Sequence, residues 1–117
     1  MNYRVIEHPP FAKGLFSAQQ TAAWQLLKQQ VPLGSVLTGL VFLQAPFGVF
    51  FDAALGFPVL LEVLDFAKPV GTMQFPEDYP PLGSTVSGIL GRFNDANRQL
   101  QVIKAAGQRK APRASFL

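Results

Sequence analysis

Three carboxylates come closest to an acid–base constellation in this sequence. Asp52, Glu62 and Asp65 lie in one apolar stretch, but carboxylates on neighbouring strands usually form a solvated rim. The chain has a single histidine, His8, and no cysteine, so it offers neither a nucleophile–base pair nor the usual ligands of zinc. Gly83 and the serine after it lack the lysine and the spacing of a phosphate loop. We therefore expect no enzyme, no metal and no cofactor.

Aromatic and cationic side chains point instead to a binding chemistry. In a strand over 47–52, Val49 and Phe51 would share one face, and Phe50 would share the other with Gly48. If Val49 and Phe51 fill a core, the Phe50 ring must point away from that core. A nucleic-acid base stacks on an exposed aromatic ring for about 1–3 kcal/mol, largely independent of sequence. Arg98 could hold a phosphate or stack on a base.

Short apolar stretches bounded by turn residues predict the strands that would position these side chains. A longer, proline-containing connection at 64–81 separates the third strand from the fourth, and Gly39 suits a tight bend within the first. Five short strands with one long link are typical of the OB-fold, whereas an immunoglobulin sandwich would need about seven. We therefore predict an all-β protein built on a five-stranded OB-fold barrel. The expected strands are 36–43, 47–53, 59–63, 85–93 and 99–103.

An amphipathic helix is expected before the barrel. Ser17 and Gln20 form a capping-box pattern, Trp24 and Leu27 repeat at helical spacing, and Pro32 prevents continuation. Two interpretations of its Trp24 face remain: the face covers one mouth of the barrel, or it forms a dimer contact. The expected organisation is an N-terminal arm, the amphipathic helix, the barrel and a basic tail, at 1–16, 17–31, 32–104 and 105–117.

Composition limits the class of protein and its partners. Apolar residues make up 49% of the 117 residues and charged residues 15%, where about a quarter is typical. No apolar run approaches the ~20 residues of a membrane span, and the first residues do not read as a signal peptide. A cytoplasmic protein without membrane attachment is the expectation. Much of the net charge of +3 lies in the tail, at Arg109, Lys110 and Arg113.

The barrel sequence resembles the S1-type RNA-binding domain of ribosomal protein S1. The segments GSVLTGLVFLQAPFGVFFDAALGFPVLLEVLDF and LGSTVSGILGRFNDANRQLQVIK carry the resemblance, which covers 32–104. It implies an OB barrel that binds single-stranded RNA through two aromatics of the second strand, a third-strand position and a pair at the last hairpin. Carried over to this chain, these positions are Phe47, Phe50, Glu62, Asn94 (or Asp95) and Arg98.

Two functions follow as expectations. The first is a module that binds single-stranded RNA by stacking and charge, helped by the basic tail. However, Glu62 stands where the family has a histidine, and its carboxylate would repel a phosphate. The alternative is therefore a protein-interaction or self-association module that keeps the barrel without RNA binding. Its surface would be the apolar barrel face with Leu40, Phe42 and Phe50, together with the Trp24 helix.

Overall fold

One helix and six strands make up the described part of the computed structural model, which comprises residues 3–7, 9–11, 18–62 and 74–104. The predicted helix and the five predicted strands are all present, with ends within two residues of those expected. The Ser17 cap, Asp65, the start of the long connection and the basic tail lie outside the described residues. The elements are β1 (Arg4–Val5), α1 (Ala18–Gln30), β2 (Val36–Ala45), β3 (Gly48–Asp52), β4 (Val59–Glu62), β5 (Thr85–Asn94) and β6 (Gln99–Lys104).

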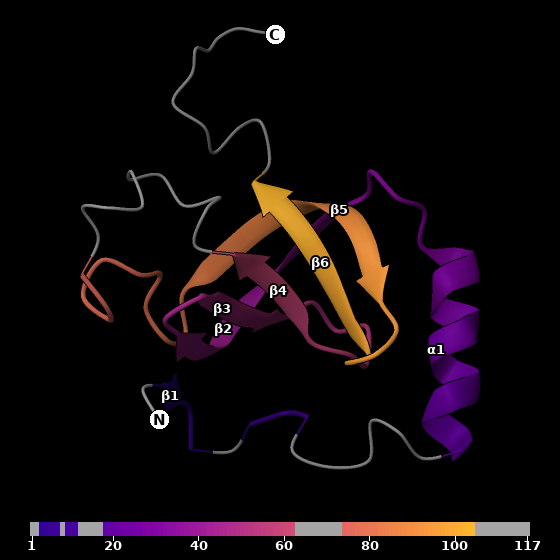
Figure 1. The fold of residues 1–117 in the computed structure, drawn as a ribbon, viewed down its shortest axis with the longest axis horizontal. Coiled ribbons are helices and arrows are strands. Elements are labelled where there is room, and N and C mark those ends of the chain that lie inside the picture. Colours follow the sequence, from indigo (N-terminus) through magenta and orange to yellow (C-terminus); the bar gives the residue numbers. More distant parts are fainter. Residues whose placement is uncertain (1–2, 8, 12–17, 63–73, 105–117) are drawn as a thin grey trace, which may run out of the picture.

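Strands β2 to β6 close into a barrel, as Figure 1 shows. The long strand β2 pairs with β5 through its first half and with β3 through its second half. Strand β4 pairs antiparallel with β3 and parallel with β6, which completes the circle. The predicted five-stranded OB-fold barrel is therefore confirmed. Gly39 lies where β2 changes partners, and a Cβ there would be 2.0 Å from the carbonyl oxygen of Asp52. Only glycine allows this close approach.

The barrel core consists of the alternate residues that each strand turns inward, because successive side chains of a strand point to opposite faces. Trp24 of α1 belongs to this core and is fully buried. Its ring lies 4.9 Å from that of Phe57 and 5.7 Å from that of Phe93, both edge-on. The helix therefore stands against the barrel beside the β5–β6 hairpin (Figure 1). Of the two interpretations of the Trp24 face, the structure agrees with the one in which this face packs against the barrel. No described helix is long and apolar enough to cross a membrane.

The N-terminal arm adds a strand that the sequence did not reveal. In β1, Arg4 pairs with Gln44 and Val5 with Leu43 of β2, and the Ile6 amide donates to the Phe42 carbonyl at 3.0 Å. This half of β2 has no pairing with β5, so one of its edges would be open without the arm. In Figure 1 the arm runs below β2 and β3.

Candidate nucleic-acid interface

The outer face of β3 is built by simple alternation along the strand. Val49 and Phe51 are fully buried in the barrel core, so Phe50 between them points to the opposite face, as predicted. Its ring is nevertheless only 9% exposed. It forms a second apolar cluster with Phe42 and Leu60, and Ile6 and Phe11 of the arm pack against this cluster. The ring thus faces away from the core but is buried in an apolar cluster that the chain's own arm packs against.

Four phenylalanine rings follow one another across this face, and we call them the aromatic row: Phe11, Phe42, Phe50 and Phe47. The ring centroids of Phe11 and Phe42 are 5.4 Å apart, and those of Phe42 and Phe50 are 6.4 Å apart. Phe47 meets Phe50 edge-on at 6.0 Å. Phe47 itself is 53% exposed, so the row runs from beneath the arm to an aromatic ring that is open to solvent. Such a ring can accept the flat face of a base.

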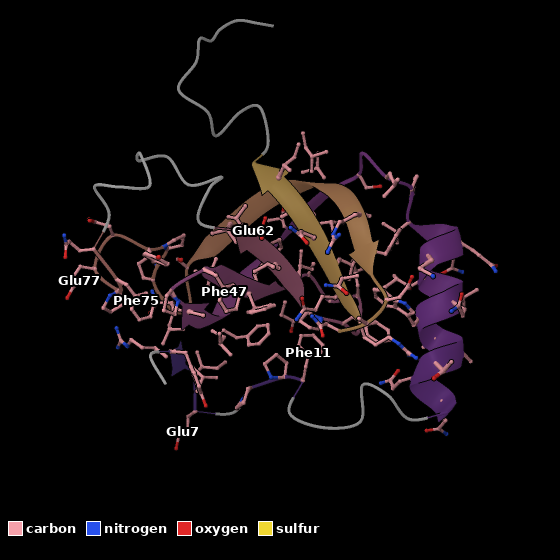
Figure 2. All side chains as sticks on the ribbon, in the orientation of Figure 1. Glu7, Phe11, Phe47, Glu62, Phe75 and Glu77 are labelled. Atoms are coloured by element: carbon pink, nitrogen blue, oxygen red, sulfur yellow. The ribbon has the colours of Figure 1, made fainter. Side chains whose placement is uncertain are left out.

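The carboxylate of Glu62 lies next to the open end of the aromatic row. Glu62 of β4 is the Cα partner of Gly48, and Phe47 directly precedes Gly48 in the turn between β2 and β3. Figure 2 labels Phe47 and Glu62 close to each other. A Cβ at Gly48 would be 2.4 Å from the carbonyl oxygen of Leu61. The space that Gly48 leaves is therefore filled by the backbone of β4. The structure brings Phe47, Phe50 and Glu62 together at one end of the β3–β4 pair.

The hairpin residues lie toward the other end of this pair, where Leu100 is the partner of Val59. Asn94 accepts a hydrogen bond from the backbone amide of Asn97 at 3.2 Å. Arg98 adopts a left-handed backbone conformation with a φ of 54° and donates to the hydroxyl of Thr21 in α1 at 3.3 Å. The hairpin positions carried over from the S1 resemblance thus also take part in the turn and in its contact with the helix.

Asp95 links the hairpin to two residues of α1. One carboxylate oxygen accepts the Trp24 indole N–H at 2.7 Å and the Lys28 ammonium at 2.8 Å. Hydrogen bonds from Lys28 and then from Trp24 lower the pKa of Asp95, since both stabilise the charged form. The described residues include no group of three metal-ligating side chains.

Known structures share this architecture, although no protein-family profile and no curated protein matches the sequence. GSP13 from Bacillus subtilis is 19% identical with a TM-score of 0.56, over 75% of this chain and 65% of that one. The alpha subunit of aIF2 from Pyrococcus abyssi is 13% identical with a TM-score of 0.54, over 74% and 31%. A chain of the a/eIF2alpha–aDim2p–rRNA complex from Pyrococcus horikoshii OT3 is 15% identical with a TM-score of 0.52, over 71% and 47%. The barrel is an S1-like OB-fold. The chain corresponds to only part of the length of each of these proteins.

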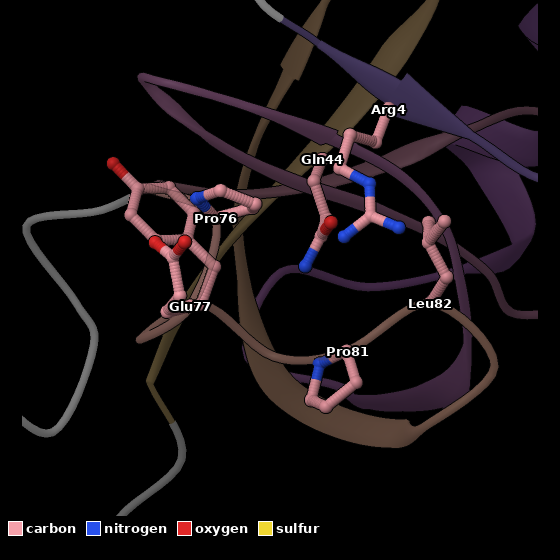
Figure 3. A pocket seen from close by; sticks show the side chains of 7 residues that line it. Arg4, Gln44, Pro76, Glu77, Pro81 and Leu82 are labelled. Carbon is pink, nitrogen blue, oxygen red and sulfur yellow. The ribbon is translucent and has the colours of Figure 1, made fainter. Parts of the chain in front are cut away.

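A pocket of about 310 Å³ opens beside the S1-like barrel, between the arm and the loop before β5 (Figure 3). Arg4 and Gln44 line it from β1 and β2. The Gln44 amide donates to the Pro80 carbonyl at 2.9 Å, and its oxygen has no hydrogen-bond partner among the described residues. Tyr79 donates its hydroxyl to the Pro46 carbonyl, and burial raises the pKa of Tyr79. Sequence reasoning missed these residues because nothing local predicts that the arm meets this loop.

Three of the residues that suggested an interaction module contact the chain itself, either in the barrel core or in the apolar cluster that the arm packs against. Phe42 and Phe50 are buried in the cluster that the arm packs against, and Trp24 is buried against the barrel. Leu40 is the exception, since it remains exposed on β2. The residues chosen for an external partner therefore mostly contact the chain itself.

Proposed function

We propose that this chain is an RNA-binding module that holds single-stranded RNA on the outer face of its S1-like barrel. The observation that carries the proposal is the aromatic row, which ends in the 53% exposed ring of Phe47. An exposed aromatic ring on an OB-fold face is a stacking platform for unpaired bases. The S1 resemblance and a structural neighbour from an rRNA complex support RNA as the ligand.

The proposed contacts with the RNA are mainly aromatic stacking, with a small number of cationic side chains. Bases would stack on Phe47 and, further along the row, on Phe50. Arg98 and Asn94, both of the β5–β6 hairpin, would contact the RNA there. Glu62 would repel a phosphate, so we place the backbone away from it and expect base edges there. The tail residues, which lie outside the described part of the chain, would add a nonspecific contribution: Arg109, Lys110 and Arg113.

The test is the fluorescence anisotropy of a labelled single-stranded RNA of about 12 nucleotides, a length suited to one OB barrel. Phe47→Leu keeps an apolar side chain but removes the ring, and it should weaken binding by about 5- to 150-fold, equivalent to about 1–3 kcal/mol for one stacked base. Phe47→Tyr keeps the ring and should bind like the unchanged protein. Leu26→Ala, which alters an exposed apolar residue of α1, is a second control.

Salt dependence checks the electrostatic contribution in the same assay. For single strands, the slope of log K against log salt is about −0.7 per phosphate neutralised. Arg98→Gln should therefore make the slope shallower by about 0.7. Binding that is indifferent to the ring of Phe47 and to salt would contradict the proposal.

A further inference from the structure

The arm, residues 3–7 and 9–11, covers the inner part of the proposed RNA face. We infer that it is a gate, which must lift before RNA can stack on Phe50 and Phe42. This inference rests on the proposed function and adds its regulation. Figure 2 shows Phe11 of the arm on the side of the barrel below β2 and β3.

Two kinds of contact hold the arm closed. The ring of Phe11 lies against that of Phe42 at 5.4 Å with a tilt of 60°, and Ile6 packs against the same cluster. Beside them, β1 occupies the edge of β2 at Leu43 and Gln44. The apolar contacts cover the rings on which bases would stack. The arm and an RNA strand therefore compete for one surface.

The arm is held far less firmly than the barrel strands. Strand β1 has two residues, and both are exposed, as is the neighbouring Tyr3. The pocket of about 310 Å³ lies between its Arg4 and the loop at 76–82, so this flank of the arm is incompletely packed. Segments with few buried contacts and exposed backbone hydrogen bonds open locally without global unfolding. A lifting arm would leave the closed barrel intact.

The described part of the arm carries one exposed residue of each charge, Arg4 and Glu7. The closed arm presents the exposed carboxylate of Glu7 on the same side as Phe11 (Figure 2). Lifting the arm would move both charges away together, so its main effect is to uncover the apolar cluster of Phe42 and Phe50. The apparent dissociation constant of a ligand is inversely proportional to the open fraction, because only the open form is competent to bind.

A reversible lock tests the gate in the full-length chain. Val5 and Leu43 are Cα partners across β1 and β2, which is a spacing that a disulfide can span, and the chain has no cysteine of its own. The double variant Val5→Cys with Leu43→Cys should bind the labelled RNA at least about 10-fold more weakly when oxidised than when reduced. The single variant Val5→Cys should bind the RNA equally well under oxidising and reducing conditions.

The opposite variant frees the arm. Ile6→Ser with Phe11→Ser removes both apolar contacts and should bind RNA about 10-fold more tightly than the unchanged chain. Tyr3→Ser alters an arm residue outside the cluster and is the matched control. Equal binding by the locked, reduced and freed proteins would overturn the gate and leave the proposed function standing. If none of them binds RNA, the proposed function fails, and the gate fails with it.

Discussion

One carboxylate of the barrel holds two residues of the helix at once. Asp95 lies in the β5–β6 turn and accepts hydrogen bonds from two residues of α1 that are one turn apart, Trp24 and Lys28. The indole N–H of a buried tryptophan needs an acceptor, because leaving it unpaired would cost about 1–3 kcal/mol. The sequence shows a polar turn at this place, but nothing local indicates its partners on a helix some seventy residues away.

The lowered pKa of Asp95 predicts how this contact depends on pH. A carboxylate whose folded pKa lies below its ordinary value of 3.8 contributes stability above that value and loses it as pH falls through the folded pKa. Asp95→Asn should therefore be less stable than the unchanged chain in urea at pH 7, with a difference that shrinks below pH 3.8. Added salt should also reduce the difference, since the carboxylate is largely exposed. The control is Glu77→Gln, which changes an exposed carboxylate in the loop before β5, away from the helix. A difference that persists unchanged in acid would contradict this account.

At the scale of elements, the barrel depends on one strand that bends between two partners. Strand β2 pairs with β5 up to Leu40 and with β3 from Leu40 onward. Gly39 stands at this corner, against the backbone of Asp52 and Ala53. Backbone atoms cannot move aside without separating the strands, so any added side-chain atom must distort the barrel.

Gly39→Ala should lower the free energy of unfolding by about 3 kcal/mol, at the upper end of what overpacking usually costs. Gly91→Ala is the matched control, because a Cβ at Gly91 would find its nearest atom at 3.7 Å, an ordinary contact distance. We expect the control to stay within about 0.5 kcal/mol of the unchanged chain. Urea or guanidinium titration of both variants measures the difference. Similar stabilities for the two variants would show that the backbone around Gly39 can shift at little cost, contrary to this prediction.

The barrel elements could be predicted from the sequence because each carries its own local signal. Apolar stretches bounded by glycine, proline or asparagine indicated β2 to β6. The alternation of Val49, Phe50 and Phe51 predicted which of these side chains point inward and which outward. Strand β1 could not be predicted, since two residues have no periodicity and their partners lie about forty positions away. The outward direction of the Phe50 ring was therefore predicted correctly, but its burial next to the arm was not.

On the scale of the whole molecule, stability is divided between a closed barrel and a segment added to its edge. Every barrel strand pairs with two other strands of the barrel, whereas β1 pairs only with β2. Global unfolding is needed to break the barrel contacts, but the loss of a few contacts at Phe42 to Gln44 frees the arm. This difference makes the opening of the arm measurable even without a ligand.

Hydrogen exchange can compare two backbone bonds of equal length. The Ile6 amide donates to Phe42 at 3.0 Å, and the Leu100 amide donates to Pro58, also at 3.0 Å. Because Ile6 exchanges whenever the arm lifts and Leu100 only when the barrel opens, protection at Leu100 should exceed that at Ile6 by at least about 100-fold. Saturating single-stranded RNA should lower protection at Ile6 further, since it favours the open state, while protection at Leu100 stays constant or rises. Equal protection of the two amides in the free protein would mean that the arm is an integral part of the barrel.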